Sequence, residues 1–99
     1  MIHRHIQQAL QSAVAVELPD ADITRILVRP CDPKFGDYQS NALMGLAKQR
    51  QMNPRQLAED VIAKLDVSEW CEPVEIAGPG FLNFRLRPEA INQALGTDA

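Results

Sequence analysis

The sequence has few cysteines and no long hydrophobic run, and both absences narrow the kind of protein it can be. Its two cysteines, Cys31 and Cys71, lie far apart, and neither has a second cysteine or a histidine pair at metal-ligand spacing. No apolar stretch approaches the roughly 20 residues that span a bilayer, and no signal-peptide core follows the first residues. We therefore expect a cytoplasmic protein with no metal site, no membrane contact and two free thiols.

An excess of basic residues is also missing. Ten Lys and Arg stand against thirteen Asp and Glu, which gives a net charge of −3, so the overall charge does not indicate a nucleic-acid-binding protein. Aromatic residues make up only 5%, whereas hydrophobic residues make up 45% of the 99 residues, as in ordinary globular proteins. We expect a single domain over residues 1–99, in which any nucleic-acid site is a local patch.

The hydrophobic periodicity predicts an α+β domain with the element order αβααββα. The expected elements are, in chain order, a helix over 2–19, a strand over 23–30, helices over 42–52 and 54–65, strands over 74–76 and 81–87, and a final helix opened by Pro88 that carries Ile91, Ala94 and Leu95. Asn53 should cap the third helix and Pro54 begin it. We expect a small, largely antiparallel sheet with helices packed on one face, the third helix contributing Leu57, Ala58, Val61, Ile62 and Leu65.

The strand expected at residues 81–87 carries the most informative pattern. Because side chains alternate across a strand, one face is uniformly apolar and must meet the core: Leu82, Phe84 and Leu86. The opposite face carries a ring, an amide and two guanidinium groups: Phe81, Asn83, Arg85 and Arg87. A ring can stack on an unpaired base, an amide can bond to a base edge, and arginines suit phosphates. Arg25 and Arg29 add to this face if their strand joins the same sheet.

Plainer interpretations of these residues stay open. Phe81 could simply be packed, Asn83 could cap a turn, and Glu75 could pair with an arginine on the same face. The other polar groups favour structural roles: His3 and His5 as surface residues, Glu59 and Asp60 on a solvated helix face, and Asp37, Tyr38, Ser40 and Asn41 as caps of the second helix. No catalytic residue is predicted, and the Gly78-Pro79-Gly80 turn lacks the pattern of a phosphate-binding loop.

Two longer segments carry a specific pair of motifs. One is Phe35-Gly36-Asp37-Tyr38-Gln39-Ser40-Asn41, followed by Leu46-Ala47-Lys48, Asn53-Pro54 and Leu57-Ala58. The other is Glu75-Ile76-Ala77-Gly78-Pro79-Gly80-Phe81-Leu82-Asn83-Phe84. In this order and spacing they resemble the N-terminal additional domain of arginyl-tRNA synthetases. The resemblance covers nearly the whole chain, whereas either motif alone would be only suggestive.

The resemblance implies a tRNA-binding module of a cytoplasmic class I ligase that joins arginine to its tRNA with ATP and magnesium. In that family the domain contacts the D-loop, and the ring and amide after the G-P-G turn, here Phe81 and Asn83, approach a D-loop base. Our interpretation adds Arg85, Arg87 and Lys34 as contacts to the RNA backbone. The catalytic domain of the same synthetase is the other implied partner. Its H-x-G-H signature does not occur before Ala99, so we expect no cofactor in this chain.

Two alternatives differ from this interpretation. The first is a free-standing tRNA-binding protein without ligase activity. The second is a protein-interaction domain in which an exposed Phe81 docks a partner chain. Salt dependence separates the second from RNA binding, because phosphate contacts release counterions and an apolar contact does not.

Overall fold

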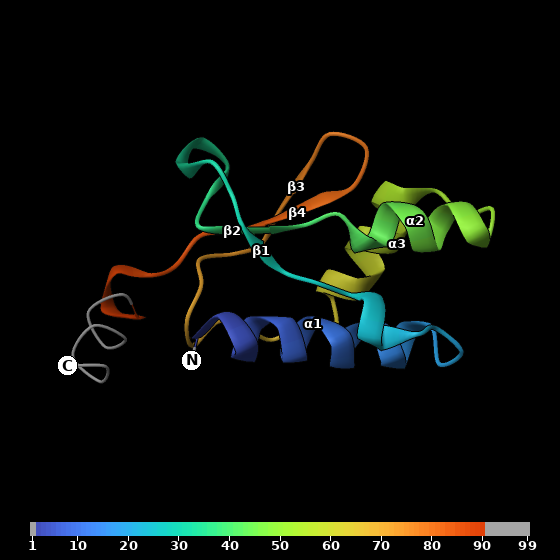
Figure 1. Cartoon of the computed structure of the whole chain (residues 1–99), viewed down its shortest axis with the longest axis horizontal. Helices are drawn as coiled ribbons and strands as arrows, with labels where there is room; N and C mark the ends of the chain where they lie inside the picture. Colours follow the sequence, from blue (N-terminus) through green and yellow to red (C-terminus); the bar gives the residue numbers. More distant parts are fainter. Residues whose placement is uncertain (1, 91–99) are drawn as a thin grey trace.

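Residues 2–90 of the chain are described by the computed structural model, which gives every helix and strand below (Figure 1). In chain order these are α1 (Ile2–Glu17), the 3-10 helix η1 (Ile23–Arg25), β1 (Arg29–Pro30), the 3-10 helix η2 (Pro33–Phe35), β2 (Tyr38–Ser40), α2 (Ala42–Gln49), α3 (Pro54–Ile62), β3 (Glu75–Ala77) and β4 (Phe81–Phe84). Residues 88–90 are helical, as the position of Pro88 predicts. Ile91, Ala94 and Leu95 of the expected last helix lie outside the described residues.

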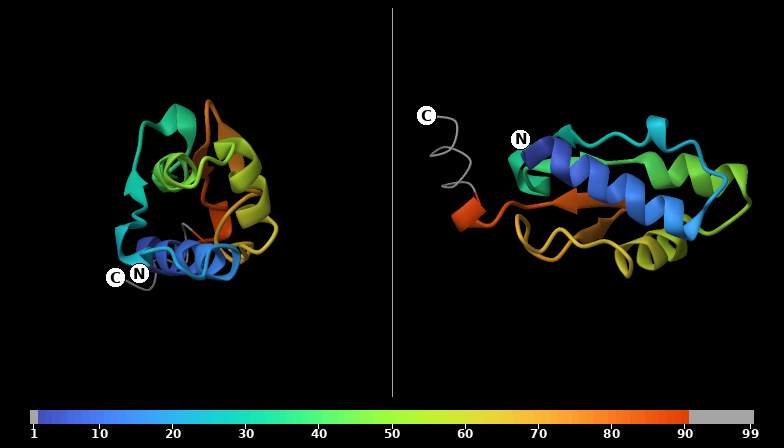
Figure 2. Two further views of the ribbon diagram at one scale, coloured as in Figure 1. Left: turned by 90° about the vertical axis from the view of Figure 1, so that its right-hand side faces the viewer. Right: turned by 90° about the horizontal axis from the view of Figure 1, so that it is seen from below.

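The strands form one antiparallel sheet of four strands in the order β1-β2-β4-β3. Helix α1 runs along the long axis beneath the sheet, and α2 and α3 lie together toward one end of the molecule (Figures 1 and 2). The α+β class and the antiparallel sheet predicted from the sequence are therefore confirmed.

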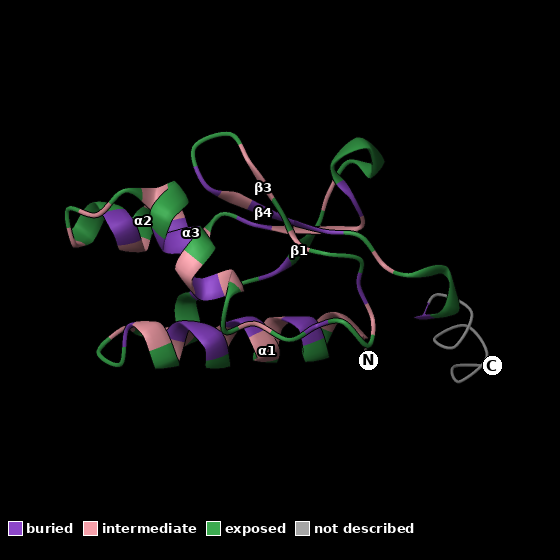
Figure 3. Ribbon diagram, turned by 180° about the vertical axis from the view of Figure 1, so that it is seen from behind, coloured by how far each residue is buried: buried purple, intermediate pink, exposed green. Residues whose placement is uncertain are grey.

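One core joins the helices to the sheet. On α1 the buried residues recur at helical spacing as Ile6, Leu10, Ala13 and Val14, and from the sheet Leu82 and Phe84 are both 0% exposed. Figure 3 shows the buried stripe of α1 turned toward the sheet. Leu57 and Val61 belong to the same core, while Ile62, Leu65 and Leu86 are partly buried and pack against it. The predicted register of the last strand is thus correct.

The segment expected as a strand over residues 23–30 is mostly not a strand. It begins as η1, because the Asp22 carboxylate accepts a hydrogen bond from the Thr24 backbone N–H at 3.1 Å and caps a helical turn. Only Arg29–Pro30 pair with the sheet. The expected alternation still holds beyond η1, since Ile26 and Val28 are buried and Leu27 is exposed.

Strand β4 ends at Phe84, three residues earlier than predicted. Its pairing with β2 stops at Asp37, whose backbone N–H donates to Phe84 O at 2.8 Å and whose carboxylate accepts from Leu86 N–H at 2.7 Å. Gly36 lies directly against this end of the strand. With φ at 125°, a Cβ there would come within 2.8 Å of Phe84 O, so only glycine fits.

Candidate nucleic-acid interface

The strand register lines up one residue from each strand across the sheet. Arg29 pairs with Gln39, Gln39 with Asn83, and Asn83 with Glu75. We call these four residues the polar row. Leu82 and Phe84 beside Asn83 point into the core, so by alternation the polar row lies on the opposite face of the sheet. Arg29 and Glu75 therefore share the face predicted from the sequence, and Glu75 forms no ion pair within residues 2–90.

Asn83 lies on this face but is not free, which corrects the expectation of an open amide. Its side chain does not cap a turn either: Asn83 is 4% exposed, and its Oδ1 accepts a hydrogen bond from Gln39 Nε2 at 2.7 Å. The Nδ2 group of Asn83 has no hydrogen-bond partner among the described residues. The amide is therefore held in place by its neighbour, with one end still available for a ligand.

Phe81 lies on the same face as Asn83 and is half-buried. It follows the Gly78-Pro79-Gly80 turn, where Gly78 adopts φ 53° and Gly80 φ 147°. The turn is tied to the start of α3, because Arg55 Nη1 donates to Gly78 O at 2.5 Å and a Cβ on Gly80 would lie 3.1 Å from Pro54 Cβ. These contacts fix the backbone just before Phe81, and its side chain remains partly accessible.

Arg85 and Lys34 are both exposed near the end of β4. Lys34 belongs to η2, and Gly36 at the end of η2 packs against the backbone of Phe84 and Arg85. Lys34 Nζ lies 5.1 Å from the centre of the Phe35 ring. Arg85 lies near Cys31: burial and then Asp37 and Asp32 raise the pKa of that thiol, and Arg85 opposes the increase. Neither Lys34 nor Arg85 forms an ion pair within residues 2–90, so both charges are available to a ligand.

Arg87 differs from the other predicted basic contacts. Its Nε pairs with Glu89 Oε2 at 3.1 Å, and its Nη1 donates to the Ser68 carbonyl at 2.9 Å. The side chain is exposed, but its charge is partly neutralised and its position is set by the turn at residues 66–70. Arg87 also lies three residues beyond the end of β4, where its backbone N–H donates to Trp70 O.

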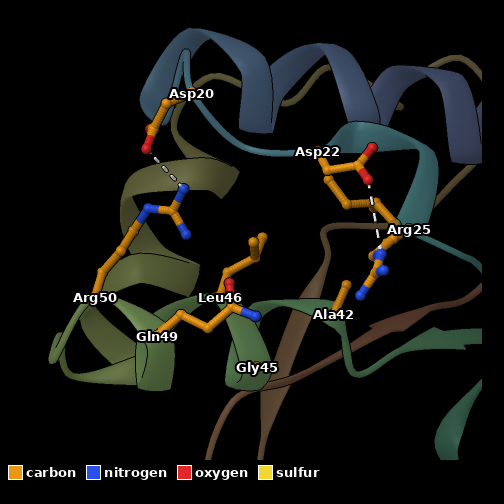
Figure 4. A pocket seen from close by; sticks show the side chains of 9 residues that line it. Asp20, Asp22, Arg25, Ala42, Gly45, Leu46, Gln49 and Arg50 are labelled. Carbon is orange, nitrogen blue, oxygen red and sulfur yellow. Dashed lines mark hydrogen bonds and ion pairs between the residues drawn. The ribbon is translucent and has the colours of Figure 1, made fainter.

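Arg25, the other basic residue considered for this face, lies elsewhere. It belongs to η1 and is 3.6 Å from Asp22. It lines a pocket of about 380 Å³ between this segment and α2, where Arg50 and Asp20 pair at 3.1 Å (Figure 4). This pocket has apolar walls from Ile26, Ala42 and Leu46.

Sequence reasoning missed the role of Gln39. This residue holds Asn83 and also lines a cavity of about 150 Å³ with Leu27, Arg29, Pro30 and Asn41. A signal was present, because Gln39 belongs to the Phe35–Asn41 motif. The sequence predicts that the polar residues beside it, Asp37, Tyr38, Ser40 and Asn41, cap the second helix. This is right only in part: Ser40 Oγ accepts from Ala42 N–H at 3.3 Å, whereas the Asn41 side chain makes no cap.

Two further expectations have mixed outcomes. His3 is not a simple surface residue: it is half-buried, its ring stacks on Tyr38 with centroids 5.0 Å apart, and its Nε2 bonds to Val28 O. His5 is exposed, as predicted. Glu59 is exposed on α3, while Asp60 is half-buried and accepts from Gln56 Nε2 at 3.1 Å.

Cys31 and Cys71 are free thiols in the structure, and burial raises the pKa of Cys71 to about 11. Within residues 2–90 no group of three or more His, Cys, Asp and Glu side chains is arranged to hold a metal ion. In the same part of the chain, every helix is too short or too polar to cross a membrane.

The sequence also matches a known family. Residues 1–86 match the family described as the arginyl tRNA synthetase N terminal domain. The chain belongs to this family. Among curated relatives, the arginine–tRNA ligase of Thermosynechococcus vestitus is 49% identical over 90 residues, which are 91% of this chain and 15% of the relative. That of Laribacter hongkongensis is 44% identical over 98 residues, 98% of this chain and 16% of the relative.

Solved structures of the family show the same fold. The arginyl-tRNA synthetase of Plasmodium falciparum superposes with a TM-score of 0.82 over 95% of this chain and 17% of that one, at 21% identity. The Thermus thermophilus arginyl-tRNA synthetase gives a TM-score of 0.78 at 30% identity, again over 95% of this chain and 15% of that one. The chain thus spans only about 15% of the length of such relatives.

Proposed function

We propose that this chain is the tRNA-binding amino-terminal part of an arginine–tRNA ligase and that it contacts the D-loop of arginine tRNA. Family membership supports the parent activity. The observation that carries the D-loop contact is that the Phe81 ring and the Asn83 amide lie on the same sheet face, outside the core. The amide is held there by its hydrogen bond with Gln39. A ring and a fixed amide side by side suit a single unstacked base, which offers a flat face and a polar edge.

In this proposal each side chain has a separate task. Phe81 stacks on the base, and Asn83 donates to its edge. Lys34 and Arg85, which are free of ion pairs within residues 2–90, contact phosphates near the end of β4, and Arg29 at the end of the polar row adds a third positive charge. Arg87 contributes less, because binding a phosphate would compete with Glu89 and the Ser68 carbonyl. A local patch of this kind is compatible with a net charge of −3.

The chemistry of the ligase lies outside this chain in the proposal. The catalytic domain of the same cytoplasmic polypeptide binds ATP and magnesium, activates arginine and transfers it to the tRNA. The sheet face described here supplies affinity and orientation, so that the acceptor end of the tRNA reaches that domain. Arginine tRNA and the catalytic domain are thus the two expected partners.

The test uses the full-length protein that carries this chain and measures arginine tRNA binding at several salt concentrations. Phe81→Ala should weaken binding by about 1–3 kcal/mol, the usual contribution of one base–aromatic stack. Asn83→Ala should cost less affinity but reduce the discrimination between D-loop bases, because edge hydrogen bonds carry sequence information. Val16→Ala, a truncation of a side chain 63% exposed on α1, is the control and should leave binding unchanged.

Each variant must first be shown to fold by its thermal unfolding curve. If folded Phe81→Ala and Asn83→Ala proteins bind and charge arginine tRNA like the parent, this face is not the D-loop site. The protein-interaction alternative would then be favoured, with a weak dependence on salt as its signature. A coding region that carries no catalytic domain would instead favour a free-standing tRNA-binding protein.

A further inference from the structure

An amide side chain has a donating end and an accepting end, and the end that faces a ligand decides which base edge it can recognise. For Asn83 the accepting end is turned toward Gln39: Oδ1 takes the hydrogen bond from Gln39 Nε2 at 2.7 Å. The side chain is 4% exposed, so it has little room to rotate freely. The other end is Nδ2, which can only donate and which has no hydrogen-bond partner among the described residues.

The ends of the polar row explain why both amides point this way. Next to Gln39 stands Arg29, and next to Asn83 stands Glu75. A guanidinium group can only donate, whereas a carboxylate can only accept. Gln39 is therefore favoured with Oε1 toward Arg29 and Nε2 toward Asn83, and Asn83 with Oδ1 toward Gln39. Reversing both amides would turn N–H groups toward the arginine and carbonyl groups toward the glutamate.

We propose that Gln39 is a positioning residue that makes this site specific for a base edge with a hydrogen-bond acceptor. The ligand group is an unprotonated ring nitrogen or a carbonyl oxygen, which receives a hydrogen bond from Asn83 Nδ2. This inference rests on the proposed tRNA function and deepens it, because it names the chemical group that is recognised. Gln39 acts through Asn83 and need not touch the base.

Replacing Gln39 with glutamate should reverse the site. A carboxylate cannot donate to Asn83 Oδ1, but it can accept from Nδ2, and Arg29 beside it balances the new charge. The Asn83 amide should then turn by 180°, with Oδ1 facing the ligand. The site of Gln39→Glu would select a donor on the base in place of an acceptor. Gln39→Met, similar in length but without a hydrogen bond, should leave the amide undirected.

The measurement uses the full-length protein and arginine tRNA with single substitutions in the D-loop. An abasic scan first identifies the position at which the parent protein contacts a base. That position is then filled by adenosine, by 1-deazaadenosine, which lacks the ring acceptor N1, or by purine riboside, which lacks the amino donor. All three have nearly the same shape, so differences in affinity report on the hydrogen bond.

The parent should bind 1-deazaadenosine tRNA about three- to tenfold more weakly than adenosine tRNA, the effect of one hydrogen bond, and should tolerate purine riboside. Gln39→Glu should show the opposite order, and Gln39→Met should discriminate little. Gln8→Glu, the same chemical change at an exposed site on α1, should keep the parental order. A merely structural role for Gln39 would weaken all three tRNAs alike.

The failure of this inference differs from failure of the proposed function. If Gln39→Glu is folded and keeps the parental order of tRNA affinities, Gln39 does not set the orientation of the Asn83 amide. Asn83→Ala would still weaken tRNA binding in that case. If the abasic scan finds no D-loop position that matters, the proposed D-loop contact is wrong and the inference fails with it. Thermal unfolding curves of the Gln39 variants exclude loss of fold as the cause.

Discussion

The basic residues at the two ends of this domain differ in whether they form ion pairs. At the pocket beside α2, Arg25 and Arg50 are paired with Asp22 and Asp20. Near the sheet face, Arg29, Lys34 and Arg85 form no ion pair within residues 2–90. The net charge of −3 for the whole chain does not reveal this difference. The difference shows that the number of basic residues does not give the positive charge open to a ligand, because the fold pairs some of these residues with carboxylates and leaves others unpaired.

The largest expected contrast between the two ends concerns glycine. Gly36→Ala should lower the free energy of unfolding by about 1–3 kcal/mol, since φ is 125° and the new Cβ would meet Phe84 O at 2.8 Å. Gly45→Ala, on α2 at the pocket, has no atom within 4 Å of the new Cβ and should raise stability by about 0.5–1 kcal/mol. Urea unfolding measures both, and equal losses would show that the two backbones are equally constrained.

The next contrast concerns charge. Arg85→Ala should weaken binding to every tRNA alike and flatten the slope of log affinity against log salt by about 0.7–0.9, the value of one phosphate contact. Arg50→Ala should leave that slope unchanged and cost at most about 1 kcal/mol of stability through the exposed pair with Asp20. Binding isotherms at four or more salt concentrations give both slopes. A flatter slope for Arg50→Ala would place the RNA at the pocket instead.

The last contrast concerns the two thiols. Burial raises the pKa of Cys71 to about 11 in the folded protein, so the thiol loses its proton less readily there than in the unfolded chain. The free energy of unfolding should therefore fall as pH rises from the ordinary thiol pKa of about 8.5. Stability should fall by at most about 1.4 kcal/mol per pH unit over this window, and Cys71→Ala should remove this part of the slope. Urea unfolding at pH 7 to 10 measures it.

Half-buried Cys31 should react with a thiol reagent first, and two reactive thiols after denaturation would confirm that neither is in a disulfide.

The parts of the fold that depend on local pattern could be predicted. Helix α1 follows from apolar spacing, and α3 from Asn53, whose Oδ1 accepts from the N–H groups of Arg55 and Gln56. The burial of Leu82 and Phe84 follows from alternation alone. Each of these features is encoded within a few residues of where it acts.

The rest depends on contacts between distant residues. Strand β2 is only three residues long, too short for alternation to reveal, and its role comes from its neighbours. Asn83 is hydrogen-bonded to Gln39, and Arg87 is hydrogen-bonded to the Ser68 carbonyl. The sequence indicates which residue types could form an interface, but pairing partners decide which of their atoms stay free.

The pairing of β2 with β4 also has a consequence for folding. Gln39 and Asn83 are 44 residues apart, and both α2 and α3 lie between them. Bringing such distant strands together requires closing a long loop, which costs chain entropy and slows folding relative to local contacts. The Gln39–Asn83 bond therefore cannot form on a nascent chain until residues beyond β4 have been made. If the face that carries Gln39 and Asn83 binds tRNA as we propose, binding would report that β2 and β4 have paired and the domain is complete.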